Sequence, residues 1–225
     1  MSVFVREIID EEWGSYFELT GAGYGVLVAA MLAVLLIGCM ISGAGGKRQI
    51  STRVLVFSAM AMALGTVTSM VKVVDMPMGG SVTLCSMFFI CLIGYLFGLR
   101  TGLLAAVAYG FLQLVTDPYI ISIPQMFTDY IFAFGALGLS GLFSDKKNGL
   151  TTGYLLGVLG RYVFTFLSGM IFFGTNGAAY NMAAPVYSLI YNGAYLVPEA
   201  LATVIILQLP PVKQGLLRVK EMAKV

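Results

Sequence analysis

The sequence predicts an all-α polytopic membrane protein, and three observations support that fold class. Of the 225 residues, 59% are hydrophobic and 11% are charged, whereas soluble domains average about 25% charged residues. The mean hydropathy is +0.90. The apolar residues gather in seven runs, most of them close to the roughly 20 residues that a membrane-spanning helix needs. This composition excludes a water-soluble globular surface and equally excludes a disordered chain.

The predicted elements follow one another with short polar breaks. Residues 1–18 are polar and acidic and lack the basic start and apolar run of a signal peptide, so we expect an extracytoplasmic tail. Only Gly98, Leu99 and Arg100 separate the third run from the fourth, which predicts a tight helical hairpin. The seven expected spans cover residues 20–42, 54–71, 82–98, 101–116, 127–144, 150–174 and 184–208.

The first span differs from the other six. It consists almost entirely of aliphatic and small residues, and a polar linker, residues 43–52, follows it. We therefore expect an accessory transmembrane helix at residues 19–46, acting as a plain anchor ahead of a six-helix core at residues 53–208. A basic cytoplasmic tail at residues 209–225 completes the expected division of the chain.

The distribution of Lys and Arg predicts the orientation in the membrane, since cytoplasmic segments carry an excess of both. With the amino terminus outside, the inner loops and the carboxy-terminal tail hold ten of these residues. The outer segments hold only Arg6 and Lys72, and Arg161 lies within a span. The sequence therefore predicts an N-out, C-in topology.

Several function classes do not fit this composition. The chain has no His, which removes Ser/His and Cys/His catalysis and the commonest zinc sites. Cys39, Cys85 and Cys91 lie in apolar runs without metal-ligand spacing, and the basic residues form no nucleic-acid-binding face. We expect no catalytic residue, no metal and no cofactor. An ion-coupled secondary transporter and an intramembrane enzyme built on two carboxylates stay as alternatives.

Those two carboxylates, Asp129 and Glu199, lie inside predicted spans. Charges are costly in hydrocarbon, so each is a candidate site residue. Asp129 is at the outer end of the fifth span, where it could instead favour a helix N-terminus. Glu199 follows Pro198 in mid-span, where it could instead pair with Arg161.

The last span carries a polar stripe. Tyr187, Tyr191 and Tyr195 recur every four residues and therefore share one helix face. Asn192 adjoins that face, and Glu199 continues it one turn deeper. Tyr also belongs to membrane-interface belts, which could explain Tyr187 but not the deeper residues. The stripe predicts the wall of a cavity.

Other spans bring polar and aromatic residues to the same depth. Gln125, Asp129 and Tyr130 lie in the outer part of the fifth span, and Thr165 and Phe173 lie in the outer half of the sixth. Together they predict an outward-opening pocket with aromatic walls, one carboxylate and no fixed cation close by. Such a pocket suits a small, flat, neutral or cationic ligand.

Small residues make a second pattern in the second span. Ala59 and Ala63, with the alternate pair Ala61 and Gly65, leave a smooth surface that another helix can approach closely. The surface could serve packing within the chain or docking of a separate membrane subunit.

Four blocks of this sequence resemble the thiamine-specific substrate-binding (S) components of energy-coupling factor (ECF) transporters. The similarity extends over about residues 53–208. The blocks that carry it are YIISIPQMFTDY at 119–130, FGALGLSGLF at 134–143, RYVFTFLSGMIFF at 161–173 and VYSLIYNG at 186–193.

The resemblance implies an S-component core of six helices that captures a vitamin outside a bacterial cell. A transmembrane coupling subunit and two ATPase subunits would then drive release inward by tilting the S component in the plasma membrane. ATP would be used only by those partners, since the chain has no Walker-type loop of its own. The spacing of Ala59 and Ala63 matches the small-residue motif with which S components dock onto the coupling subunit.

The resemblance also assigns site residues. Binding roles are implied for the matching positions Asp129 (usually Glu in the family), Tyr130, Gly169, Tyr187 and Asn192. The whole predicted binding set is Tyr119, Gln125, Asp129, Tyr130, Thr165, Gly169, Phe173, Tyr187, Tyr191, Asn192, Tyr195 and Glu199.

Besides Asp129, three further positions depart from the family pattern. Thr165 stands where the family usually has His, and Phe173 and Tyr109 stand where it has Trp. The expected ligand is therefore thiamine or a related heteroaromatic, with a thiamine precursor, a B6 vitamer or another small cationic metabolite left open.

Overall fold

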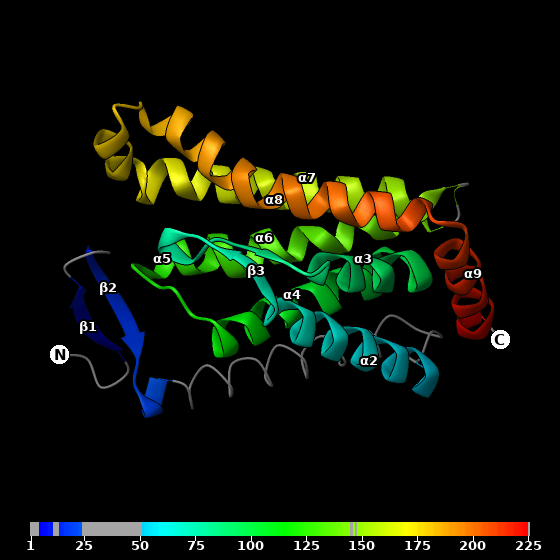
Figure 1. Cartoon of the computed structure of the whole chain (residues 1–225). Helices are drawn as coiled ribbons and strands as arrows, with labels where there is room; N and C mark the ends of the chain where they lie inside the picture. Colours follow the sequence, from blue (N-terminus) through cyan, green and yellow to red (C-terminus); the bar gives the residue numbers. More distant parts are fainter. Residues whose placement is uncertain (1–4, 11–13, 24–50, 145, 147, 225) are drawn as a thin grey trace.

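The structure is a computed structural model that describes residues 5–10, 14–23, 51–144, 146 and 148–224. Most of the accessory helix predicted at residues 19–46 lies outside these residues, so that prediction stays untested. The described part is a bundle of apolar helices with two short β-hairpins (Figure 1).

Six helical elements build the bundle, as predicted for residues 53–208. They are α2 (Thr52–Ser69), α3 (Ser86–Phe97), α4 (Leu99–Thr116), a composite helix (Ile123–Phe143), α7 (Gly149–Phe172) and α8 (Ala184–Gln208). Among the described residues, five of these are long and apolar enough to cross a membrane, and α3 is shorter with 12 residues. Large apolar side chains such as Leu159 and Ile205 are exposed on the bundle surface, where lipid would cover them. The polytopic membrane fold is confirmed.

The composite helix carries Asp129 and is irregular along its length. It comprises α5 (Ile123–Met126), the π-helical segment η2 (Phe127–Phe132), α6 (Ala133–Gly135) and the 3₁₀ segment η3 (Ala136–Phe143). It begins four residues before the predicted start at 127, because Ser122 accepts a hydrogen bond from Gln125 N (3.3 Å) and Pro124 lies in the first turn. The wider π turn, a geometry frequent at functional sites, contains Asp129.

Glycines let the composite helix lie at the centre of the bundle. A Cβ on Gly138 would come within 2.6 Å of the Gly102 backbone in α4. Substitution there would therefore push η3 and α4 apart. The close contact places η3 against α3, α4 and α7 together.

The predicted hairpin between the third and fourth runs is confirmed, since only Gly98, with φ of +86°, connects α3 to α4. The predicted start of the third helix at 82 is wrong, because α3 begins at Ser86. Residues 81–83 instead form strand β4, which pairs antiparallel with β3 (Lys72–Asp75) around the 3₁₀ turn η1 (Pro77–Gly79). Residues 72–83 are called the β3–β4 segment below.

The two ends of the described chain hold further elements. The acidic region predicted as a tail forms an antiparallel hairpin of β1 (Val5–Asp10) and β2 (Gly14–Leu19). The basic tail forms helix α9 (Pro210–Lys224), in which Lys220 Nζ donates to Tyr95 Oη (2.8 Å) and to the Ser144 carbonyl (3.0 Å). The β1–β2 hairpin and α9 lie at opposite ends of the bundle (Figure 1).

Candidate ligand-binding cavity

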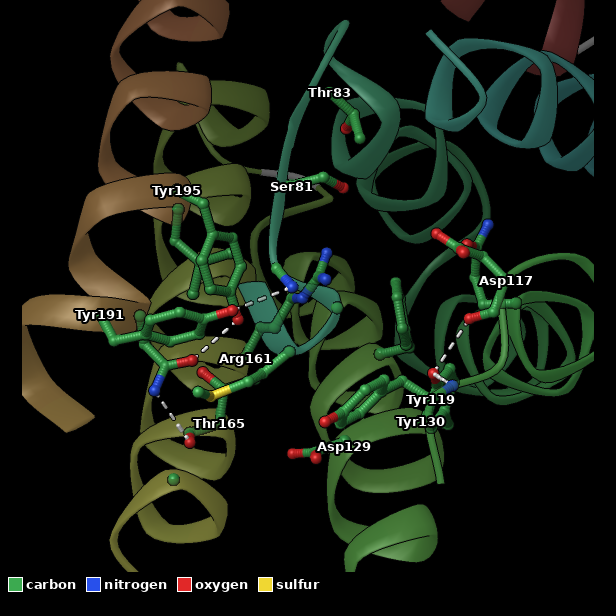
Figure 2. A pocket seen from close by; sticks show the side chains of 18 of the residues that line it. Ser81, Thr83, Asp117, Tyr119, Asp129, Tyr130, Arg161, Thr165, Tyr191 and Tyr195 are labelled. Carbon is green, nitrogen blue, oxygen red and sulfur yellow. Dashed lines mark hydrogen bonds between the residues drawn. The ribbon is translucent and has the colours of Figure 1, made fainter. Parts of the chain in front are cut away.

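A cavity of about 120 Å³ lies between the β3–β4 segment, α4, the composite helix, α7 and α8. A single water needs only about 10–15 Å³ on the same scale, so the space fits a small organic molecule. All twelve predicted binding residues line it: Tyr119, Gln125, Asp129, Tyr130, Thr165, Gly169, Phe173, Tyr187, Tyr191, Asn192, Tyr195 and Glu199. Figure 2 shows several of them around the cavity. Their contact with a ligand stays a prediction.

The β3–β4 segment closes one side of the cavity and is bound to α8. The hydroxyl of Tyr191 accepts a hydrogen bond from Gly80 N (3.1 Å) and donates to the Pro77 carbonyl. A Cβ at position 80 would lie 2.7 Å from that hydroxyl, so a side chain there would displace Tyr191. This bridge spans 114 residues of sequence.

Met78 fastens the tip of the same segment. Its backbone is left-handed (φ 62°), which is an uncommon conformation for a non-glycine residue. Its sulfur accepts hydrogen bonds from Asn176 Nδ2 (3.0 Å) and Tyr187 Oη (3.4 Å). Asn176 belongs to the 3₁₀ turn η4 (Gly174–Tyr180) between α7 and α8. The tip is thus held by residues of both the turn and α8.

An ion pair holds the base of the segment. Lys72 Nζ lies 2.9 Å from Asp117 Oδ2 at the end of α4 and 3.6 Å from Asp75 Oδ1. Burial lowers the pKa of Lys72, but hydrogen bonds and attraction from Asp117 and Asp75 outweigh it and leave the pKa raised. The ammonium group therefore stays charged at neutral pH and keeps β3 against α4.

Glu199 connects the other strand to the centre of α8. Glu199 is 3% exposed, and its carboxylate accepts hydrogen bonds from Thr83 N (3.1 Å), Thr83 Oγ1 (2.8 Å), Ser86 Oγ (3.3 Å) and Met87 N (3.4 Å). Ser86 and Met87 lie at the N-terminus of α3, where a negative charge is favourable. The alternative pairing with Arg161 is wrong, because the donors that reach Glu199 come from the start of α3 and from β4.

Asp129 is oriented by Gln125, one helical turn earlier. Gln125 is 1% exposed, and its Nε2 donates to Asp129 Oδ2 (2.7 Å) and to the Tyr119 carbonyl (3.1 Å). Its Oε1 accepts from Ile121 N (3.1 Å). The amide therefore fixes both the carboxylate and the preceding loop.

Tyr130 presents its ring to the cavity, while its hydroxyl shapes the connection after α4. The hydroxyl donates to the Asp117 carbonyl (3.0 Å) and accepts from Tyr119 N (2.7 Å). Tyr119 in turn stacks on Phe173, with ring centroids 6.0 Å apart and planes at 30°. The two rings give the cavity an aromatic wall at the position where Phe173 replaces the expected Trp.

Asn192, on α8, connects α7 to α8 through hydrogen bonds. Its Nδ2 donates to the Thr165 carbonyl (3.1 Å) and the Ser188 carbonyl (2.9 Å), and its Oδ1 accepts from Tyr195 Oη (2.8 Å). A Cβ on Gly169 would collide with Ser188 Oγ, so glycine permits this close approach. The polar groups of Asn192 are thus engaged within the protein, and its role includes holding the two helices together.

Arg161 corrects the predicted electrostatics of the pocket. The expectation of one carboxylate and no nearby cation is wrong, since Arg161, Glu199 and Asp117 line the cavity together with Asp129. The guanidinium lies over the Phe134 ring at 4.1 Å, and its Nε is buried without a hydrogen-bond partner among the described residues. Figure 2 shows Arg161 between the tyrosines of α8 and Asp129.

The small residues of α2 separate into two faces. Ala61 and Gly65 are buried, and the Gly65 carbonyl accepts a hydrogen bond from Tyr109 Oη (3.0 Å). Ala59 and Ala63 are exposed. Internal packing therefore accounts for one pair only, and the other pair is accessible to a second protein.

Sequence reasoning missed the part of the wall that the β3–β4 segment supplies. Met78, Gly79, Gly80, Ser81 and Thr83 line the cavity, but the sequence indicated only a short break between the second and third spans, with Thr83 inside the third. Arg161, by contrast, was recognisable as the single basic residue inside a predicted span, which marks a functional position by the same rule as the carboxylates.

Comparisons with known proteins find three similarities. A family model described as thiamine transporter protein (Thia_YuaJ) matches residues 55–218. Thiamine transporter ThiT of Bacillus subtilis (strain 168) is 32% identical over 166 residues, which are 68% of this chain and 84% of that protein. A solved structure of ThiT from Listeria monocytogenes has a TM-score of 0.54 and 24% identity, covering 69% of this chain and 88% of that one. The structural match supports the fold.

Proposed function

Because this chain belongs to the thiamine transporter protein (Thia_YuaJ) family, we propose that it binds thiamine in the cavity and delivers it to an ECF-type uptake transporter as the substrate-binding subunit. The names of the relatives indicate thiamine as the ligand, and the charges and aromatic rings of the cavity are compatible with it. No enzymatic step belongs to this function.

The charge balance of the cavity is the observation that best supports the proposal. In their ionised forms, the carboxylates of Asp129 and Glu199 and the guanidinium of Arg161 leave one net negative charge. Asp117, also at the wall, is paired with Lys72 outside the cavity. One residual negative charge beside aromatic rings complements a monocation with flat aromatic rings, and thiamine is one.

In this proposal the carboxylate of Asp129 binds the cation and accepts hydrogen bonds from donor groups of the ligand. Glu199 has its oxygens engaged by Thr83, Ser86 and Met87, so it contributes charge rather than direct contacts. Tyr119, Phe173 and the tyrosines of α8 offer rings for stacking.

The proposed function also includes an orientation of the protein in the membrane. Strands β1 and β2 lie at the opposite end of the bundle from α9, and the bias of Lys and Arg favours an external amino terminus and an internal carboxy terminus in a bacterial plasma membrane. Ala59 and Ala63 would dock a transmembrane coupling subunit, which two ATPase subunits would power.

A related ligand is the second candidate, because Thr165 and Phe173 offer less hydrogen-bonding reach and less ring area than His and Trp. Titration of the purified protein with thiamine, a thiamine precursor and pyridoxine tests both. Tightest binding of thiamine supports the proposal, and tightest binding of another compound replaces it. Recovery of ATPase subunits with the tagged protein tests its place in a transporter.

A further inference from the structure

We propose that Tyr180 forms an outer encounter site that captures the flat cationic ligand before it enters the cavity. The inference rests on the proposed function, since it concerns the route by which that ligand arrives. Tyr180 is the last residue of η4 and does not line the cavity.

The first observation is a continuous series of tyrosine rings. Tyr180 stacks on Tyr187, with centroids 5.8 Å apart and planes at 17°. Tyr187 stacks on Tyr191 at 5.8 Å and 26°, and Tyr191 meets the edge of Tyr195 at 5.9 Å and 71°. The last three rings line the cavity. The series therefore runs from a residue outside the cavity to its wall.

The second observation is the change in burial along the series. Tyr180 is 58% exposed, whereas Tyr187 and Tyr195 are each 7% exposed. The three inner hydroxyls are bonded to Met78, to the Pro77 and Gly80 backbone, and to Asn192. Tyr180 is thus the ring of the series that is most open to an arriving molecule.

The third observation is the fixed position of the ring. Behind Tyr180 the chain turns through Asn181, whose φ is 53°, and Met182 N donates to the Gly177 carbonyl (2.9 Å). A Cβ on Gly177 would lie 3.1 Å from Tyr187 Cβ, so η4 packs directly on α8. The backbone that carries Tyr180 is therefore fixed against α8, and the ring itself rests on Tyr187.

An exposed tyrosine attracts cations weakly, so Tyr180 would bind the ligand transiently and the cavity would bind it durably. A transient site on the entry route raises the rates of association and dissociation together and leaves the equilibrium affinity unchanged. The alternative is a membrane-interface tyrosine, which would leave both rates unchanged.

Stopped-flow tyrosine fluorescence with thiamine tests the proposal on the full chain. Tyr180→Ala should slow association by about twofold to fivefold, the scale of an exposed cation–π contact, and slow dissociation equally. Tyr180→Leu keeps an apolar side chain against Tyr187 but removes the aromatic face, so it should slow both rates as Tyr180→Ala does. Tyr180→Phe keeps the aromatic face and should match the parent. Phe132→Ala is the matched control, since Phe132 is 51% exposed and lies outside the cavity.

Unchanged association in both Tyr180→Ala and Tyr180→Leu would overturn the encounter site while leaving the proposed function intact. A weaker equilibrium affinity through faster dissociation would also overturn it, because Tyr180 would then belong to the final binding site. Failure of the parent itself to bind thiamine would overturn the proposed function and the encounter site together.

Discussion

Glu199 accepts hydrogen bonds from both the backbone N and the hydroxyl of Thr83, at 3.1 and 2.8 Å, across 116 residues of sequence. Through this pair the β3–β4 segment and the start of α3 depend on a carboxylate in the middle of α8. Mid-membrane carboxylates are usually candidates for ligand contact, yet here the position of a neighbouring segment accounts for the buried charge.

Glu199→Gln should therefore destabilise the protein more than it alters ligand chemistry. An amide places donors against the donors of Thr83 and Ser86, which costs about 1–3 kcal/mol. Thermal unfolding in detergent should show a midpoint several degrees lower. The control Glu221→Gln, at an exposed position of α9, should leave the midpoint unchanged. An unaltered midpoint would show that these hydrogen bonds contribute little.

Asp129→Asn should weaken thiamine binding while the fold is retained, since Gln125 can still bond residue 129. Loss of a charged hydrogen bond predicts about 1.5–3 kcal/mol, roughly a tenfold to 150-fold rise in Kd. Calorimetric titration measures it. Glu221→Gln, on α9 and outside the cavity, is the control. An affinity equal to the parent's would remove Asp129 from the binding site.

Tyr191→Phe should loosen the β3–β4 segment without removing a ring from the cavity wall. The substitution removes the hydroxyl that bridges Gly80 and Pro77. The hydrogen bonds that hold the β3–β4 segment against α8 are then weaker by about 1–2 kcal/mol. Thiamine should dissociate several-fold faster in a displacement assay. Tyr162→Phe provides the comparison, because Tyr162 donates a similar bond to the Leu189 carbonyl on α8. Equal dissociation rates would contradict a closing role.

The double change Thr165→His with Phe173→Trp should raise thiamine affinity. Thr165 donates to the Tyr162 carbonyl of its own helix, so its hydroxyl is partly used, whereas His reaches further into the cavity. Trp adds stacking area and a stronger cation–π face. We expect a gain of about 1–3 kcal/mol if both contacts form. A loss of affinity would show that this pocket binds thiamine through other contacts.

Ala63→Trp should abolish thiamine uptake by cells that carry the whole transporter, while the isolated protein still binds thiamine. Ala63 is exposed on α2, away from the cavity lining, and a bulky ring prevents close helix approach. Ile205→Trp on exposed α8 is the control. Uptake at the parental rate would reject docking through this face.

The sequence predicts the helices well because each span must be apolar over a length set by the bilayer. It also predicts the polar cavity residues Asp129, Asn192 and Glu199, because they are costly in lipid unless they face an interior site. Tyr119 and Gly169 were implied only by the family resemblance. The tertiary contacts are not predictable in this way. The bond between Tyr191 and Pro77 joins a span to a loop, and nothing local in either segment indicates it.

Arg161 illustrates a different limit. Its position inside a span was evident, but the sequence suggested Glu199 as its partner, whereas the structure places the guanidinium over Phe134 at 4.1 Å. The choice depends on how α7 is rotated against the composite helix, which periodicity alone does not determine. The late start of α3 has a similar origin, since Thr83 is held in β4 by Glu199 from another helix.

The most direct test of the account is native mass spectrometry of the protein purified from cells without added ligand. The account predicts one bound molecule with the mass of thiamine, retained by the parent and lost from Asp129→Asn. A different co-purified molecule in the parent, with no exchange when thiamine is added, would contradict it.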